Sequence, residues 1–173
     1  PHEKATSGSA ERQVTSGGSA RTARSAAVVS LTAGSLWAYS RPSPAMLAEA
    51  VCKRLDSYKG DFCIESFDPF AVADVRKLRP KICRGQLSMN FLKEPSGLPR
   101  YQRFLMTNVL LNWYTRPDFL AYQFSDRDNF CLDLARRVWG VQEVSWTLRS
   151  KEELLACEKV GSIGIFEKFD PEA

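Results

Sequence analysis

Residues 62–70, FCIESFDPF, contain the boundary between a predicted strand and a predicted helix. A short apolar run, typical of a buried strand, ends at Ser66 and Phe67. Asp68 and Pro69 follow. They predict the start of a helix, because aspartate caps helix N-termini and proline suits the first helical position. The stretch therefore predicts a core strand that gives way to a helix through a polar and an aromatic residue.

The same succession of strand and helix extends over residues 46–173. Apolar residues recur at helical spacing in several segments, and short strand-like runs lie between them. The expected helices are 46–58, 70–80, 98–114, 126–139 and 151–160, and the expected strands are 61–66, 82–87, 117–122, 143–148 and 161–167. Such alternation indicates βα units and a parallel sheet. No strand is followed by a glycine-rich phosphate loop, so a partial TIM-type (β/α) barrel of about five βα units is favoured over a dinucleotide-binding sheet.

Capping residues set the expected helix ends. Pro80 ends the helix that Asp68 begins, and Asp126 or a neighbour caps the helix that Gly140 closes. Ser150 and Glu153 have the spacing of a capping box.

Residues 1–45 differ in composition from the rest. Ser, Thr, Gly and Ala make up 26 of these positions, and most of the segment lacks apolar periodicity, so it is expected to be disordered. Residues 28–31 and 35–39 are candidates for short strands. The abrupt junction with residues 46–173 leaves three interpretations: a truncated or mis-framed gene product, a half-barrel that needs a partner chain, or a non-catalytic binding or regulatory relative with a basic tail.

Charge and hydropathy argue against several classes of protein. The net charge is +4, of which residues 1–45 carry +3, so the expected folded part is nearly neutral and no nucleic-acid partner is expected. No apolar run approaches the roughly 18 residues of a membrane span, and no signal peptide is visible. The five cysteines form no CxxC motif. They are expected to be buried free thiols of a cytoplasmic protein rather than a metal cluster.

Polar or aromatic residues stand at the carboxyl end of every expected strand. These ends are 65–67, 85–87, 122–123, 146–149 and 166–168. In a (β/α) barrel the functional groups stand at these ends.

The ordered motifs resemble the C-terminal half of a glycerophosphodiester phosphodiesterase barrel. They are IESFDP, LRPKICRGQL, PDFLAY, WTLRS and IFEKFDP, and the resemblance covers residues 46–173. It implies hydrolysis of a glycerophosphodiester to glycerol 3-phosphate and an alcohol, with a divalent cation, Ca²⁺ or Mg²⁺. Such chemistry uses the cation to stabilise phosphoryl charge and two histidines for proton transfer.

The residues that would carry this chemistry in the family are missing from the chain. Its single histidine, His2, matches no family motif, and residues 28–44 contain no acidic residue and no lysine where the family places a Glu-x-Lys strand. We therefore name no catalytic residue and no metal ligand, and expect this chain to be inactive alone.

The resemblance assigns supporting roles to four residues. Ser66 and Phe67 are expected to line a substrate pocket, Trp146 to offer an apolar face to the glycerol or head group, and Glu167 to bind a hydroxyl. The alternatives are ordinary core aromatics for Phe67 and Trp146, and a solvated side chain for Glu167. Self-association through open sheet edges is also expected.

Overall fold

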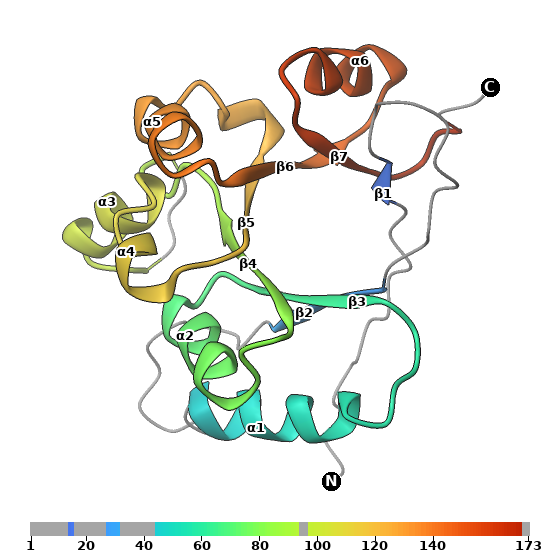
Figure 1. The fold of residues 1–173 in the computed structure, drawn as a ribbon. Helices are drawn as coiled ribbons and strands as arrows, with labels where there is room; N and C mark the ends of the chain where they lie inside the picture. Colours follow the sequence, from blue (N-terminus) through green and yellow to red (C-terminus); the bar gives the residue numbers. More distant parts are fainter. Residues whose placement is uncertain (1–13, 16–26, 32–43, 94–96, 171–173) are drawn as a thin grey trace, which may run out of the picture.

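The structure is a curled, mostly parallel sheet with helices along its outer side (Figure 1). It is a computed structural model that describes residues 14–15, 27–31, 44–93 and 97–170. The strand order is β1-β7-β6-β5-β4-β3-β2. The strands are β1 (Val14–Thr15), β2 (Ala27–Leu31), β3 (Phe62–Ser66), β4 (Cys83–Ser88), β5 (Phe119–Gln123), β6 (Gln142–Leu148) and β7 (Ile163–Phe166). Strands β2 to β7 are parallel, and β1 pairs with β7 antiparallel.

The helices alternate with these strands. They are α1 (Pro44–Leu55), α2 (Pro69–Leu78), α3 (Arg100–Thr107), α4 (Asn112–Thr115), α5 (Phe130–Trp139) and α6 (Lys151–Lys159), with a 3₁₀ turn η1 (Phe124–Asp126). The predicted partial (β/α) barrel is confirmed, with six parallel strands rather than about five. The additional strand, β2, lies within the predicted low-complexity segment. It includes the candidate strand 28–31, whereas the candidate strand 35–39 lies outside the described residues.

Alternate side chains of the strands build separate cores on the two faces of the sheet. The inner face holds a cluster of Leu87, Phe119, Ala121, Val144 and Ile165. On the outer face, β2 and β3 pack against α1 and α2 through Leu31, Ile64, Ala48, Cys52, Ala71 and Val75. Because successive side chains of a strand point to opposite faces, β3 contributes Ile64 to the outer core and Cys63 to the inner cluster. This two-sided burial explains the continuous apolar runs of the sequence.

Most of the predicted helix ends are confirmed. The Asp68 side chain accepts a hydrogen bond from the Phe70 amide at 2.8 Å, and Ser150 accepts one from the Glu153 amide at 3.3 Å. Gly140 ends α5 with φ of 62°, a conformation that glycine adopts without a Cβ penalty. The cap predicted at Asp126 or a neighbour is Asn129, and Asp126 itself lies in the preceding 3₁₀ turn.

The predicted helix 98–114 is two helices. The chain turns after α3, where Val109 adopts φ of +49°, and α4 then runs beside α2. Val109 is buried with Leu120 and Tyr122. The Arg76 guanidinium donates to the Tyr114 carbonyl at 3.2 Å. The apolar residues on both faces of the segment therefore serve two different packing sites.

The cysteines all lie in helices or strands, as predicted, but they are not all buried. Cys52 and Cys157 are buried, Cys63 and Cys131 are partly buried, and Cys83 is exposed. The prediction of buried thiols is thus wrong for Cys83, because β4 begins at this residue near the amino-terminal end of the sheet. Among the described residues, no helix combines the length and apolarity needed to cross a membrane.

Candidate functional site

Three aromatic rings meet at the carboxyl ends of the strands. Phe67 directly follows β3, and its ring centroid lies 5.7 Å from that of Trp146 on β6, with an interplanar angle of 78°. The buried ring of Phe91, which follows β4, lies 5.9 Å from Phe67 at 84°. Edge-to-face pairs of this kind are favourable arrangements of aromatic rings. Phe67 and Trp146, two of the predicted site residues, are therefore brought together from distant parts of the sequence.

Hydrogen bonds fix the orientation of this aromatic pair. The indole Nε1 of Trp146 donates to the Ala121 carbonyl on the neighbouring strand at 2.9 Å. The Gln86 amide Nε2 donates to the carbonyls of Ser66 at 3.0 Å and Phe67 at 3.1 Å. Trp146 is thus held by β5, the strand next to its own, and the segment that carries Phe67 is held by β4, the strand next to β3. Trp146 and Phe67 stay partly exposed. This fixed pair of rings is named the aromatic wall.

Ser66 is fully buried and its hydroxyl is engaged twice. The Oγ donates to the Leu31 carbonyl at 2.8 Å and accepts from the Asp68 amide at 3.0 Å. Strand alternation places Ser66 on the same face as Ile64, which packs against the outer helices. Its hydroxyl joins β2 to the start of α2, and through the backbone it supports the position of Phe67.

Glu167 lies just beyond β7 and is largely solvent-exposed. Its Oε1 is 3.9 Å from Nε of Arg149, and its backbone amide donates to the Leu148 carbonyl at 3.1 Å. The structure therefore places this carboxylate beside a guanidinium of the β6–α6 connection.

Two acidic groups near these strand ends received no functional role from the sequence. Glu65 is fully buried on β3 and accepts a hydrogen bond from the Ser30 hydroxyl at 2.7 Å. Asp126 accepts from the Asn90 amide at 3.0 Å and pairs with Lys93 at 2.7 Å, which ties the segment after β4 to η1. The polar residue within a buried strand was a signal for Glu65, but no local pattern indicated its partner.

The described residues do not fit the expected divalent cation. Among them, no group of three or more His, Cys, Asp or Glu side chains is placed to share an ion. Three carboxylates at this end of the sheet, those of Glu65, Asp126 and Glu167, contact Ser30, Lys93 and Arg149 respectively. Hard divalent cations need several oxygen ligands converging on one point. His2 lies outside the described residues.

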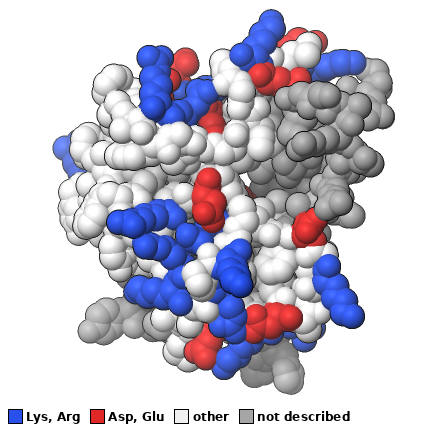
Figure 2. Space-filling view, in the orientation of Figure 1, with Lys and Arg blue, Asp and Glu red and all other residues white. Residues whose placement is uncertain are grey.

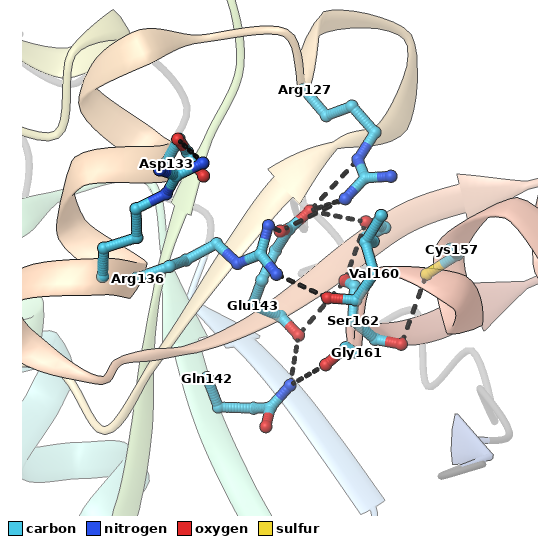
Figure 3. A network of polar contacts seen from close by, with 11 residues as sticks. Arg127, Asp133, Arg136, Gln142, Glu143, Cys157, Val160, Gly161 and Ser162 are labelled. Carbon is cyan, nitrogen blue, oxygen red and sulfur yellow. Dashed lines mark hydrogen bonds and ion pairs between the residues drawn. The ribbon is translucent and has the colours of Figure 1, made fainter.

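A separate polar network on the outer side of β6 is structural (Figure 3). Glu143 is 1% exposed, and its carboxylate lies 3.0 Å from Nη2 of Arg127 and 3.0 Å from Nη1 of Arg136. The Ser145 hydroxyl donates to the same carboxylate at 3.1 Å. A buried carboxylate of this kind requires such partners. The network joins β6 to η1 and α5.

The surface carries both signs of charge. Figure 2 shows Lys and Arg side chains gathered over the lower part of one face, with acidic side chains among them. Exposed ion pairs of the described residues include Arg79 with Asp56 at 2.6 Å. Pairs of this kind contribute little to stability.

The fold and the aromatic strand ends define a protein of the (β/α)-barrel class. Solved structures of similar fold include a putative glycerophosphoryl diester phosphodiesterase from Silicibacter pomeroyi, at 21% identity and a TM-score of 0.55. A second is a phosphodiesterase from Oleispira antarctica in complex with the product sn-glycerol-3-phosphate, at 16% identity and a TM-score of 0.51.

These likenesses cover part of each structure. They extend over 72% of this chain and 40% of the first structure, and over 71% of this chain and 45% of the second. The chain therefore has the fold of part of a glycerophosphodiester phosphodiesterase barrel, which confirms the predicted resemblance at the level of fold. No protein-family profile and no curated protein matches the chain.

Proposed function

We propose that residues 46–173 are the C-terminal half of a glycerophosphodiester phosphodiesterase-like barrel and bind a glycerophosphodiester at the carboxyl ends of the strands. The contact of Phe67 with Trp146 at that end of the sheet, 5.7 Å between centroids, carries the proposal. Barrel enzymes place their substrates there. The similar structure from Oleispira antarctica was solved with sn-glycerol-3-phosphate, which supports this class of ligand.

In this proposal the aromatic wall binds the glycerol or head group, and Ser66 supports that wall through the backbone. A partly exposed indole held in one orientation suits an apolar ligand surface. Glu167 would reach a ligand hydroxyl by leaving Arg149, to which its contact is 3.9 Å. Because that carboxylate is exposed, the exchange of partners costs little.

We further propose that the chain binds but does not hydrolyse the diester alone. Hydrolysis requires proton transfer at both the attacking and the leaving oxygen, and stabilisation of phosphoryl charge. The described residues at this end include no histidine, and the arrangement of carboxylates there does not suit a cation. In a complete barrel these groups, with Ca²⁺ or Mg²⁺, would come from outside residues 46–173, for example from a partner chain. Five cysteines free in the structure support a reducing compartment, the cytoplasm.

Tryptophan fluorescence tests ligand binding directly. Glycerophosphocholine and glycerol 3-phosphate should each change the emission of the full chain in a saturable way. Trp146→Phe should abolish most of this change, whereas Trp113→Phe, which alters an indole that is 71% exposed on α4, should preserve it. Equal responses from the two variants would contradict the proposed site.

An assay of glycerol 3-phosphate release tests the absence of hydrolysis. The purified full chain, given glycerophosphocholine with Ca²⁺ or Mg²⁺, should release no product above the chelator control. Release that a chelator abolishes would show that the chain contains a catalytic centre. That result would overturn the proposal that the chain alone is inactive. The proposed binding site would still be tested by the fluorescence measurement.

A non-catalytic binding or regulatory role is the second candidate. The hydrogen bonds from Gln86 and Trp146 favour it, because they fix the aromatic wall without any contribution from a catalytic group. Both candidates predict ligand binding. They differ in whether a complementary half-barrel, added as a second chain, produces hydrolysis.

A further inference from the structure

A pair of cysteines lies at the end of the sheet opposite the aromatic wall. Cys63 on β3 and Cys83 on β4 are register partners in neighbouring parallel strands. Neighbouring strands lie about 4.7–4.9 Å apart, and register partners present their side chains on the same face. Cys63 packs against the inner-face cluster, so both thiols are directed to that face.

The cysteine pair is open to solvent on one side and borders the apolar inner-face cluster on the other. Cys83 is exposed, while Cys63 is partly buried. The next inner-face position on β4 is Gly85, over which the ring of Phe119 lies. A reagent or ion can therefore reach the pair from the Cys83 side, and the apolar cluster beyond Cys63 excludes water from the other.

We propose that Cys63 and Cys83 form a two-thiolate binding site for a soft monovalent cation of the Cu(I) class. Binding exchanges the two thiol protons for two sulfur–metal bonds, and both protons pass to solvent. No electron is transferred. The complex carries one negative charge, compared with two for a pair of bare thiolates.

The ligand count selects this class of ion. No group of three or more His, Cys, Asp or Glu within the described residues is placed to share an ion, so a four-coordinate zinc site does not fit. Thiolates are soft ligands, and soft ions such as Cu(I) prefer them. Each metal–sulfur bond is roughly 2.3 Å, taking the zinc–thiolate value, so a two-coordinate ion can span two side chains that start one strand spacing apart.

Competition with a Cu(I)-selective chelator, without oxygen, tests the site in the full chain. The unmodified protein should take one Cu(I) from bicinchoninate. Cys83→Ser and Cys63→Ser should each weaken this binding by at least about a hundredfold, whereas Cys131→Ser, which changes a partly buried thiol on α5, should leave it unchanged. Equal affinity in the three variants would overturn the proposal.

Alkylation followed by mass spectrometry gives a readout that needs no variant. Bound Cu(I) should protect Cys63 and Cys83 together from iodoacetamide and leave the reaction of Cys131 unchanged. Protection of one member of the pair without the other would overturn a shared site, even if Cys63→Ser failed to fold.

Discussion

The ring of Phe119 lies directly over Gly85, its register partner on the neighbouring strand. A Cβ at position 85 would stand 2.7 Å from Cδ2 of that ring and closer still to two other ring atoms. Because the ring is buried in the inner-face cluster, it cannot move aside without disturbing its neighbours. The missing side chain at Gly85 therefore creates the space in which Phe119 packs.

Gly85→Ala should lower the free energy of unfolding by about 1–3 kcal/mol, the usual cost of overpacking a core. Urea unfolding followed by circular dichroism would measure it. Gly60→Ala is the control, since its contact is with the exposed side chain of Tyr58, which can move. The same alanine placed in a Phe119→Leu background should cost less. An equal cost in both backgrounds would refute the steric explanation.

Glu143→Gln should destabilise the fold by about 3–5 kcal/mol, because it leaves two guanidinium groups beside a buried neutral amide. Thermal and urea unfolding would measure the loss. Asp133→Asn breaks the exposed pair with Arg137 on α5 and should change stability by less than about 1 kcal/mol. Similar losses from the two variants would show that burial of Glu143 does not matter.

Tyr122 should make the protein less stable as the pH rises from about 10 to about 12. Burial is the main reason that the pKa of Tyr122 is raised from 10.0 to about 12, with a hydrogen bond from Asn129 opposing the shift. In this interval the unfolded chain loses the phenol proton while the folded chain keeps it, so stability that is complete below pH 10 declines by up to about 3 kcal/mol.

Absorbance titration of tyrosinate would detect this behaviour. One tyrosine should ionise late in the unmodified protein, and Tyr122→Phe should remove that late step. The variant loses the hydrogen bond to the Thr107 carbonyl and about 1 kcal/mol at neutral pH, but its stability should depend less on pH above 10. An unchanged late step in the variant would assign it to another residue.

Gln86→Leu should weaken binding of glycerol 3-phosphate while leaving the protein folded. It removes the amide that holds the Ser66 and Phe67 carbonyls, which costs about 1–3 kcal/mol and loosens the aromatic wall. Fluorescence titration and urea unfolding would separate the two effects. Gln142→Leu is the control. It also removes an amide that donates to two carbonyls, but Gln142 lies at the amino-terminal end of β6, away from the aromatic wall, so this variant should preserve binding. Weakened binding in this control would exclude a local effect.

If the chain associates through the sheet edge, as expected from its sequence, Val28→Lys should reduce the average mass in sedimentation at high protein concentration. Val28 lies on β2, the last strand in the sheet order, and lysine on an edge strand opposes pairing with another chain. Val138→Lys alters a side chain that is 62% exposed on α5 and should have no such effect. A larger effect from the α5 variant would assign association to the helices.

Much of the fold followed from local sequence. Asp68, Gly140 and Ser150 set helix ends where predicted, because capping depends on residues close in the chain. The predictions that were wrong depended on distant contacts. The turn at Val109 depends on packing against Leu120 and Tyr122, and the exposure of Cys83 depends on where β4 begins within the sheet.

The candidate site was predicted in part. Phe67 and Trp146 stand at strand ends and were selected through the resemblance, but their contact depends on the curvature of the sheet between β3 and β6. The proposed roles of Ser66 and Glu167 stay predictions. The hydrogen bonds of Gln86 with the Phe67 carbonyl and of Asp126 with the Asn90 amide could not be predicted, because each pair lies far apart in sequence.

The alternation of strands and helices, the helix caps and the resemblance to a barrel family follow from periodicity and from neighbouring residues. Contacts between distant segments place Phe119 over Gly85, two arginines beside Glu143, and Cys63 next to Cys83. These relationships depend on strand register and on packing across the sheet. A shift of one residue would reverse the face that each side chain occupies.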